Sequence, residues 1–399
     1  MKILAVQETD WLDRNPILHH RMLESLAVSG DEVLVLDYDI LWRSKGRWPL
    51  LQRRRVVRDS AKFIRDSGVV VVRPAMLRLP GLARPTWLLM TTVELLRAFR
   101  SFKPDVVVAY GLSNALVARV LAALTRTRFV VHSFDVLHAI AEPSYLAPLA
   151  RIVERAVLRA ADKVIVVHRA LLDYVAGMGV RRSKIEFIMN GFTVRTADPA
   201  RVAEVRRRHG IDDDEVLVLF IGWLYSHSGL LEVARQLVES NRYSGYRLVV
   251  AGDGDLLTDL RRLARTPDRG ERLKVLGKLP VEDIQDLIAA ADVGLCVSTP
   301  SPAMRYVVPS KVDEYLELGR PVLATRLPGM LAELGEVASM IWIDRPGDAL
   351  AALTQFVAGP ADPRSQLAKR GEAARAYGLQ RETWATVTAR FRAVLRGPG

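Results

Sequence analysis

The stretch "DVGLCVSTPSPAMRYVVPSKVDEYLELGRPVLAT", residues 292–325, contains an apolar run, a helix-like segment and a second apolar run. Short runs of Val, Leu and Ile separated by helix-length segments are typical of parallel strands buried on both faces. Ser310 is a good N-cap and Asp313 could complete a capping box, so we expect a helix to begin at Lys311. Gly319 is placed for a left-handed C-cap before the next strand. The stretch predicts a strand, a helix and a strand in succession.

The same alternation continues in both directions along the chain. Thirteen apolar runs carry it, at 2–6, 32–38, 69–73, 105–111, 128–135, 163–168, 184–189, 215–222, 247–254, 272–277, 292–298, 320–325 and 339–344. A polar, turn-rich segment at 190–215 separates the two series. We therefore predict an α/β protein with two doubly wound, Rossmann-like domains that face each other across a cleft.

The length of 399 residues is too great for one compact core. We expect the domains to span residues 1–192 and 193–375. The remaining residues, 376–399, have helical spacing and are expected to form a C-terminal helix that packs back towards the first domain.

Composition limits the classes of partner and the compartment. The formal net charge of +12 favours anionic partners: nucleic acid, nucleotide phosphates or an acidic membrane surface. Cys296 is the only cysteine, which excludes an intrachain disulfide and a cysteine-rich zinc site. No export signal is recognisable, and the most apolar stretches fall short of the roughly 20 residues of a spanning helix. We expect a cytoplasmic protein.

Lys311 would lie in the first turn of its helix, where a cation is disfavoured by the helix dipole. A lysine and free backbone N–H groups that converge there favour a phosphate ligand. Glu314, on the same side of that turn, could accept hydrogen bonds from a vicinal diol such as ribose. The alternative is an exposed ion pair between Lys311 and Glu314, which contributes little.

"YVVPSKVDEYLELGRPVLAT" (306–325) resembles the donor-binding signature of retaining glycosyltransferases of the GT-B fold, in particular family 4. Further segments resemble family motifs in the family's order: "KIEFIMNG", "FIGWLYSHSGLLEVARQL", "RLVVAGDGDLLTDLRRLA" and "LGKLPVEDIQDLIAAADVGLCVS". The resemblance implies that the second domain binds a nucleotide-diphosphate sugar as co-substrate. The residues expected to contact this donor are Gly222, Gly252, Gly277, Arg305, Tyr306, Ser310, Lys311 and Glu314.

Two departures from the family pattern concern the donor site. The family often has a further glutamate where this chain has Tyr306, and it carries an arginine and a lysine for the diphosphate where this chain has Trp223 and Ser228. Lys311 or Arg305 would have to supply the lost positive charge. A degenerate, non-catalytic member of the family is therefore an alternative.

The first domain is expected to bind the acceptor, a glycan or a lipid-linked molecule in surface polysaccharide or glycolipid synthesis. His132 and Asp135 end the run 128–135, at the edge of the sheet where ligands of open α/β sheets bind, and either is the candidate catalytic residue. Trp11, Asp13 and Arg14 are candidates for acceptor contact, with a plain surface loop as the alternative. The resemblance implies a front-face displacement with retention, in which the leaving diphosphate takes the acceptor proton.

We expect no metal site and no tightly bound cofactor. The aspartates of "DYD" (37–39) and "DGD" (253–255) are interpreted as turn residues, so a divalent metal is not required by any clear motif. A G-x-G-x-x-G fingerprint is absent after the first strand, which gives no support for nicotinamide binding.

Two basic, amphipathic segments, 50–68 and 76–90, could lie on anionic lipid at the inner face of the membrane, or could form helix faces packed on the sheet. Arginines are scattered over both halves rather than gathered in an aromatic-lined stripe, so nucleic acid is not an expected partner. A nucleotide-sugar epimerase of the same architecture and a non-catalytic basic binding protein remain the alternative functions.

Overall fold

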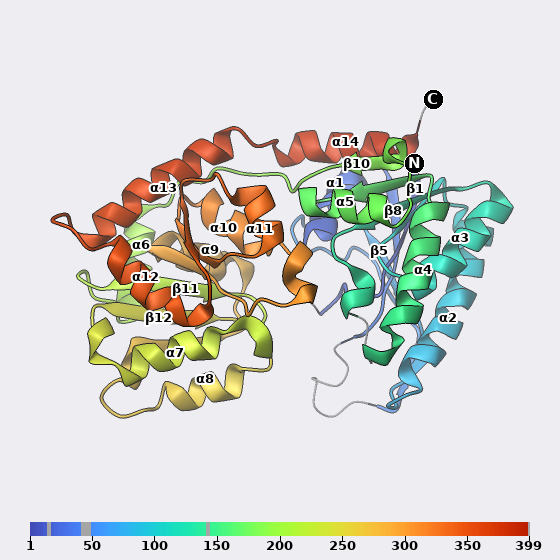
Figure 1. The fold of residues 1–399 in the computed structure, drawn as a ribbon. Coiled ribbons are helices and arrows are strands. Elements are labelled where there is room, and N and C mark those ends of the chain that lie inside the picture. Colours follow the sequence, from blue (N-terminus) through green and yellow to red (C-terminus); the bar gives the residue numbers. More distant parts are fainter. Residues whose placement is uncertain (14–16, 41–48, 141–143, 398–399) are drawn as a thin grey trace. The chain divides into compact units, whose positions relative to one another are not determined.

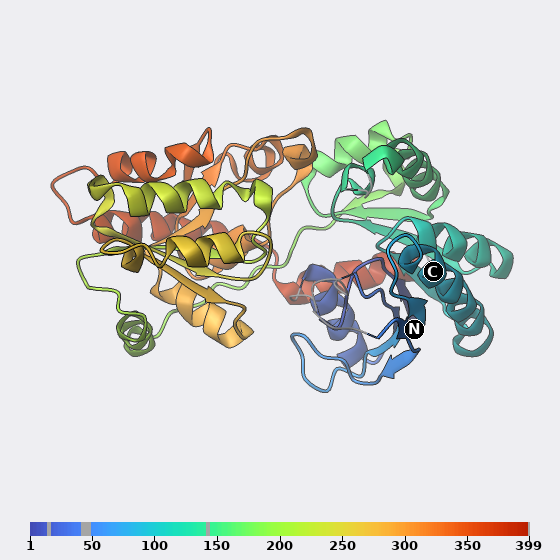
Figure 2. The same cartoon turned by 90° about the horizontal axis from the view of Figure 1, so that it is seen from below.

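The computed structural model describes residues 1–13, 17–40, 49–140 and 144–397. It divides into two compact units. The first contains Met1–Asn190 together with Trp384–Gly399, and the second contains Gly191–Thr383. Figures 1 and 2 show both units from two directions.

The first unit is built on an eight-stranded sheet with the order β10-β9-β8-β7-β1-β2-β5-β4. The strands are β1 (Lys2–Val6), β2 (Glu32–Leu36), β4 (Arg55–Val57), β5 (Val70–Arg73), β7 (Val106–Ala109), β8 (Arg128–Ser133), β9 (Lys163–Val166) and β10 (Ile185–Phe187). All neighbours are parallel except β4, which pairs antiparallel with β5 at the edge. Strand order reverses between β1 and β7, so their carboxyl ends form the switch point where open α/β sheets bind ligands.

The first unit takes its final helix from the end of the chain. Its helices are α1 (Leu18–Val28), α2 (Ala83–Arg97), α3 (Ser113–Thr125), α4 (Ala147–Ala160), α5 (Arg169–Gly177) and α14 (Trp384–Arg396). Val387, Phe391 and Leu395, which are spaced as one face of α14, are buried in the core with strand residues such as Ile3 and Val35. Hydrophobic burial therefore holds this helix on the first sheet (Figure 1).

The second unit has a six-stranded, fully parallel sheet with the order β13-β12-β11-β14-β15-β16. The strands are β11 (Val216–Ile221), β12 (Tyr246–Ala251), β13 (Leu273–Gly277), β14 (Val293–Cys296), β15 (Val322–Thr325) and β16 (Met340–Ile343). Its switch point lies between β11 and β14. The helices are α6 (Pro199–Arg208), α7 (Leu230–Glu239), α8 (Leu257–Leu263), α9 (Val281–Ala290), α10 (Lys311–Glu317), α11 (Pro328–Leu334), α12 (Ala349–Phe356) and α13 (Pro363–Leu379).

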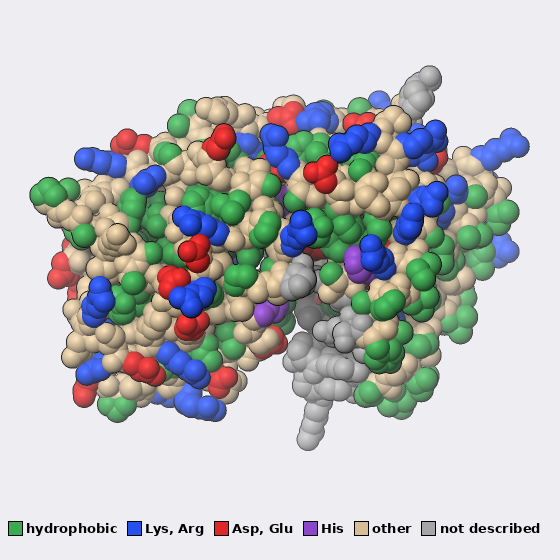
Figure 3. All heavy atoms as spheres, in the orientation of Figure 1, with side chains coloured by type: hydrophobic (Ala, Val, Ile, Leu, Met, Phe, Trp, Pro, Cys, Tyr) green, Lys and Arg blue, Asp and Glu red, His purple; other side chains and the backbone are tan. Residues whose placement is uncertain are grey.

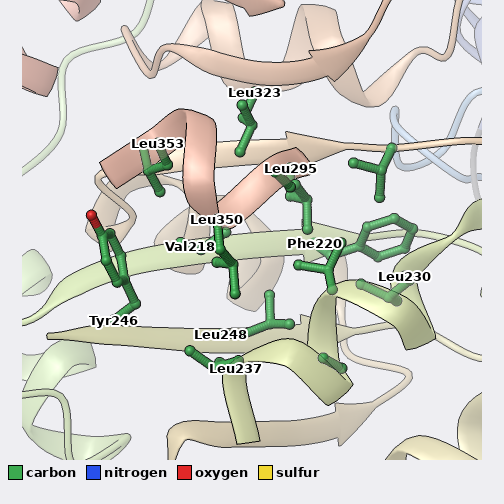
Figure 4. Packing of buried hydrophobic residues seen from close by; sticks show 14 of the residues in the cluster. Val218, Phe220, Leu230, Leu237, Tyr246, Leu248, Leu295, Leu323, Leu350 and Leu353 are labelled. Carbon is green, nitrogen blue, oxygen red and sulfur yellow. The ribbon is translucent and has the colours of Figure 1, made fainter. Parts of the chain in front are cut away.

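Strand β11 is buried on both faces and contributes to two cores. Val218 and Phe220 belong to a cluster formed with α7 and α12, shown in Figure 4. Leu217, Leu219 and Ile221 point to the opposite face, where α9 and α10 pack. This alternation explains the continuous apolar run in the sequence, since neither face can carry polar side chains.

The prediction of a doubly wound α/β fold is confirmed, and each of the thirteen apolar runs contains a strand. Segment 50–68 differs from the helical expectation. It forms β3 (Leu51–Gln52), which pairs with β6 (Met76–Leu77), then β4 and a series of turns. Arg54 of this segment pairs with Glu94 of α2 at 2.8 Å instead of lying on an amphipathic helix.

Helix α13 remains with the second unit, so the chain returns to the first unit at Trp384 and not at residue 376. Close packing accounts for this difference. A Cβ atom at Gly371 would lie 2.1 Å from the Gly319 carbonyl oxygen, and one at Gly378 would lie 2.4 Å from the Phe192 ring. The two glycines thus let the C-terminal half of α13 pack closely on the rest of the second unit.

Candidate functional site

Helix α10 is fixed against β11 by a buried tyrosine. Val312, Tyr315 and Leu316 form its buried face, as the sequence predicts. The Tyr315 hydroxyl donates to the Leu219 carbonyl at 2.9 Å and accepts from the Ile221 N–H at 3.1 Å. These bonds fix the helix relative to the strand that ends at the switch point.

The end of α10 has the predicted glycine cap. Gly319 has φ +66°, its N–H donates to the Leu316 carbonyl at 3.0 Å, and the Arg320 N–H donates to the Tyr315 carbonyl at 2.9 Å. This is a Schellman motif, which requires a left-handed residue. The start differs from the expectation, because Ser310 is itself helical and its side chain makes no capping hydrogen bond.

Lys311 extends across the carboxyl end of β11. Its Nζ lies 3.5 Å from the centroid of the Phe220 ring, although α10 and the Phe220 side chain are on opposite faces of the sheet. A cation over a ring face is attracted by the ring quadrupole. Desolvation lowers the pKa of Lys311 to about 8, while Cys296 and Glu314 act in the opposite direction.

Lys311 has no ion pair and no hydrogen bond to the part of the chain that the structure describes, and its ammonium lies over the Phe220 ring beside the Gly222 turn. A Cβ atom at Gly222 would lie 3.6 Å from Nζ. A half-buried ammonium without an anion is costly, since burial of a charge is normally compensated by pairing. The arrangement is open to an anionic ligand at the switch point.

Three glycines predicted to contact the donor lie side by side at the carboxyl ends of β11, β12 and β13. The Gly222 N–H donates to the Ala251 carbonyl at 3.0 Å, and the Gly252 N–H donates to the Gly277 carbonyl at 2.8 Å. A Cβ atom at Gly252 would lie only 1.8 Å from the Gly222 carbonyl oxygen. Only glycine allows this approach of two strand ends.

Glu314 is exposed, so its carboxylate is accessible to a ligand. Desolvation by surrounding protein atoms raises its pKa to about 7, Glu317 and Asp313 raise it further, and Lys311 and Arg195 oppose them. Within the described residues its side chain makes no hydrogen bond or ion pair. The ion pair with Lys311, which was the structural alternative for these two residues, is therefore not formed.

The other predicted donor residues lie in the loop before α10. Arg305 and Tyr306 end a short 3-10 helix, Pro302–Tyr306, and the Arg305 guanidinium lies 5.7 Å from the Tyr306 ring centroid. This helix packs on α11, since a Cβ atom at Gly329 would lie 3.0 Å from the Arg305 carbonyl oxygen. Arg305 is exposed.

The residues that stand in place of the family's arginine and lysine provide no positive charge. The Ser228 hydroxyl is buried and donates to the Tyr225 carbonyl at 2.7 Å. Trp223 packs beside Gly254, where a Cβ atom would lie 3.0 Å from the indole nitrogen. Lys311 is thus the cation that the structure brings to the Gly222 turn.

The switch point of the first unit is occupied by the protein's own carboxylate. Glu8 follows β1, and its Oε1 accepts hydrogen bonds from the N–H groups of Leu112, Ser113 and Asn114 at 3.0, 2.5 and 3.1 Å. These N–H groups begin α3, and a carboxylate there is also favoured by the helix dipole. A Cβ atom at Gly111 would lie 2.6 Å from Glu8 Cγ, so the Glu8 side chain packs directly against the backbone after β7 and fills the space at this switch point.

His132 and Asp135, predicted near the acceptor, differ in accessibility. His132 is buried among Tyr110, Phe134 and Phe391, with ring centroids 5.5, 4.5 and 5.1 Å away. Its ring nitrogens have no hydrogen-bond partner in the described structure, and burial lowers its pKa to about 3. Asp135 is half-buried, so of the two it alone reaches the surface.

The residues predicted to contact the acceptor also differ in accessibility. Trp11 has an exposed fraction of 0% and its ring packs 4.1 Å from the His20 ring, so the structure places it in the core and not on the surface. Asp13 is exposed and accepts from Arg73 at 2.9 Å. Arg14 lies outside the described residues.

The aspartates of "DYD" are not turn residues, which corrects the sequence interpretation. Asp37 and Asp39 are buried and pair with Arg73, which also pairs with Asp10 and Asp13. Ligand atoms of Asp10, Asp13 and Asp39 lie within 4.8 Å of one another, a spacing that could hold a metal ion. Arg73 already neutralises part of this charge. The aspartates of "DGD" are exposed: Asp253 accepts from the Gly254 N–H, as a turn residue does, whereas Asp255 accepts from the Ser226 N–H, 29 positions earlier.

Sequence reasoning missed Phe220 and Glu8. Phe220 directly precedes "IG" at the strand end, where an aromatic ring beside a glycine turn was the available signal. Glu8 stands two residues after the first predicted strand, at a position where the sheet edge binds ligands.

Two family models match the chain in succession. The first, "Glycosyl transferase 4-like domain", matches residues 19–191, and the second, "Glycosyl transferases group 1", matches residues 215–358. The fold is that of the GT-B glycosyltransferases. The chain belongs to the glycosyltransferases of group 1, with a family 4-like first domain.

Relatives and solved structures agree with this assignment. An uncharacterized glycosyltransferase of Methanocaldococcus jannaschii is 24% identical over 45% of this chain, and the match spans only 46% of that protein. The 2-deoxystreptamine glucosyltransferase of Streptomyces kanamyceticus is 24% identical over 68% of this chain and 75% of its own length. The crystal structure of Anabaena HepE in complex with UDP-glucose has a TM-score of 0.71 at 17% identity and covers 98% of both chains.

Proposed function

We propose that this glycosyltransferase moves a sugar from a nucleotide-diphosphate donor to a glycan or lipid-linked acceptor with retention of anomeric configuration. The observation that carries the proposal is the Lys311 ammonium, held over Phe220 at the Gly222 turn without an anionic partner among the described residues. A pyrophosphate would supply the missing negative charge. The glycine turns at Gly222 and Gly252 would contact the phosphates of the bound donor, because glycine lets the backbone approach a ligand closely.

Glu314 is proposed to bind the ribose of the donor. It stands one helical turn from Lys311, is exposed, and has no competing bond within the described chain. A carboxylate can accept hydrogen bonds from both hydroxyls of a vicinal diol. The pair would thus recognise the two parts that all nucleotide-diphosphate sugars share.

The chemistry would need a stabilised leaving group more than a protein nucleophile. Departure of the nucleoside diphosphate places negative charge on its terminal phosphate, which the Lys311 ammonium would stabilise. In the proposed front-face reaction this phosphate takes the acceptor proton while the acceptor oxygen bonds to the anomeric carbon. Asp135, the surface-reaching candidate of the first unit, would orient the acceptor. The catalytic role of His132 remains a prediction.

Features of similar proteins support the donor class. HepE was crystallised with UDP, with UDP and glucose, and with UDP-glucose. A curated relative from Bacillus subtilis is named as a putative teichuronic acid biosynthesis glycosyltransferase, which is consistent with a role in surface polysaccharide synthesis.

The direct test is a thermal-shift screen of the full chain against UDP-, GDP- and ADP-sugars, followed by NMR analysis of the anomeric configuration of the product. We expect one base to stabilise the wild-type protein and the product to keep the donor's configuration. A product of inverted configuration would contradict the retaining mechanism, and conversion of the sugar without any acceptor would indicate an epimerase. Absence of a shift with every nucleotide sugar would refute the donor site.

A further inference from the structure

The outward face of α3 is apolar along its whole length. Leu116, Val120 and Leu124, spaced four residues apart on one side of the helix, are exposed by 41%, 55% and 77%. Valine and leucine are usually buried in a protein core, so the exposure of Val120 and Leu124 is unusual. Helix α3 also contains no acidic residue. A helix that faces solvent with leucines in register has an unpartnered hydrophobic face.

Helix α4 continues this surface. Leu149 and Ile152 are exposed by 59% and 67%, and Tyr145, just before the helix, is exposed by 77%. Leu149 and Ile152 are three positions apart on one side of α4, and Tyr145 lies in the 3-10 helix Ser144–Leu146 that precedes it. Helix α4 packs beside α3, and α3 packs beside α2, so the three helices form a continuous layer on the first unit.

Helix α2 adds Leu89 and Leu96, with exposed fractions of 61% and 36%. In Figure 3, hydrophobic side chains gather on the side of the first unit that carries α2, α3 and α4. Single exposed leucines are ordinary, but apolar residues in register on three neighbouring helices mark an interaction surface.

The charges of this layer have one sign at the surface. The only acids of α2, α3 and α4 are Glu94 and Glu154, and both are buried. Arg151, Arg155 and Arg159 are exposed at intervals of four residues along α4. A Cβ atom at Gly179 would lie 3.6 Å from Arg159 and 3.8 Å from Arg155, so this row runs along the flank towards the end of α5. Arg155 and Arg159 follow the exposed Ile152 at helical spacing, so basic and apolar side chains lie next to each other on the outer side of α4.

We propose that the outer face of α2, α3 and α4 docks on an anionic membrane surface. An amphipathic layer binds lipid by inserting apolar side chains at the acyl boundary while basic side chains contact the acidic headgroups. Charge complementarity selects this partner. A second copy of the same face would bring arginine rows without matching carboxylates, which disfavours self-association. In the described residues no helix is long and apolar enough to cross a bilayer, so the contact is peripheral.

This surface shares no residue with the basic segment 50–68 that the sequence suggested, and of the apolar residues named above it shares only Leu89 with segment 76–90. Trp87, the largest apolar side chain of the second segment, is completely buried. The membrane surface is thus provided by helices whose exposed residues only the folded structure identifies.

The proposal is tested by flotation of the purified full chain with vesicles of phosphatidylcholine alone and with vesicles that also contain phosphatidylglycerol. We expect binding to the anionic vesicles and a decrease with added salt, because exposed charges are screened. The double variant Val120→Glu with Leu124→Glu should lower the bound fraction about tenfold by placing charges in the apolar layer. Circular dichroism should stay unchanged, since both side chains face solvent.

Two further variants separate the contributions. Leu379→Glu, on α13 of the second unit and 78% exposed in the wild type, adds a charge to an apolar surface position outside the layer and should leave vesicle binding unchanged. Replacement of Arg151, Arg155 and Arg159 by Gln should abolish the preference for anionic vesicles. The proposal is overturned if wild-type protein does not float with anionic vesicles, or if the Val120 and Leu124 variant binds as the wild type does. A dimer that this variant dissociates, without vesicle binding, would identify a second copy as the occupant and also overturn it.

Discussion

The two units have the same type of sheet, but their switch points are filled differently. At the end of β1, Glu8 accepts three backbone N–H groups at the start of α3. At the end of β11, Lys311 stands over Phe220 without an anionic partner in the described structure. The N–H groups at the first switch point are paired with a carboxylate of the chain itself, whereas the ammonium at the second is unpaired within the described residues. A doubly wound fold therefore does not define a nucleotide site by itself; the residues at the reversal decide it.

Removal of the unpaired cation should have the largest effect. We expect Lys311→Met to lower sugar transfer about 100-fold or more, as loss of a leaving-group stabiliser does. Steady-state kinetics with the donor identified by the screen would measure it. Lys274→Met, which removes another partly buried lysine of the same unit, is the matched control and should retain activity. Equal losses in both variants would mean that Lys311 acts through stability.

The glycine turn that frames the second switch point should be intolerant of any side chain. Gly252→Ala would place a Cβ atom 1.8 Å from the Gly222 carbonyl oxygen, in a backbone with φ +159°. We expect a loss of unfolding free energy of about 3 kcal/mol or more in denaturant titration, because the backbone must move. Gly245→Ala has open space and an ordinary φ and should change stability by no more than ~0.5 kcal/mol.

Glu8→Gln tests the internally satisfied switch point. The variant keeps the shape but loses the charge that accepts several hydrogen bonds, and we expect it to destabilise the first unit by about 2 kcal/mol. Its affinity for the donor should equal that of the wild type, because the proposed donor residues belong to the second unit. Weaker donor binding in Glu8→Gln would contradict this prediction, because it would mean that the first switch point also contributes to donor binding.

Glu314→Ala should weaken donor binding by about tenfold, the usual scale for a hydrogen bond to a charged group. Calorimetric titration of the donor would give the change. Free nucleoside and nucleoside diphosphate should lose affinity by the same factor if the carboxylate contacts the ribose. An effect confined to the intact nucleotide sugar would assign Glu314 to the sugar instead.

The pKa shifts predict a narrow optimum for donor affinity. Desolvation lowers the pKa of Lys311 to about 8 and raises that of Glu314 to about 7, so the charged pair exists mainly between these values. Affinity measured against pH should be bell-shaped and fall on both sides. Lys311→Met should remove the alkaline limb, and Glu314→Gln the acidic limb. A flat profile between pH 6 and 9 would contradict the proposed roles.

The same lysine affects stability with a defined sign. Its folded-state pKa lies below the unfolded value of 10.5, so the unfolded chain binds more protons between about pH 8 and 10.5. The charged lysine therefore costs stability below about pH 8, and this cost decreases as pH rises to 10.5. Lys311→Met should accordingly raise the melting temperature at pH 7 while it lowers activity.

Much of the second unit could be predicted from local sequence. Strand positions, the start of α10 at Lys311 and the Gly319 cap depend on hydrophobic runs and turn residues within a few positions. The contacts that decide the site depend on distant segments. Helix α10 and the Phe220 side chain lie on opposite faces of β11, and Lys311 reaches the ring by extending past the carboxyl end of the strand. The spacing of residues in the sequence does not reveal this contact.

The first unit shows the same limit. His132 ends an apolar run and looked accessible, yet Phe391 from the far end of the chain covers its ring. Asp37 and Asp39 resembled turn residues because their partner Arg73 is more than thirty positions away. The short strands β3, β4 and β6 lie in polar or basic surroundings and gave no periodic signal.

The return of α14 to the first sheet has a consequence for biosynthesis. Val387, Phe391 and Leu395 are translated after residues 1–190, but the core of the first unit is incomplete without them. The second unit, which ends at Thr383, takes no residue from α14. A chain truncated before Trp384 is therefore expected to form the second unit but to expose the unfinished core of its amino-terminal half to chaperones.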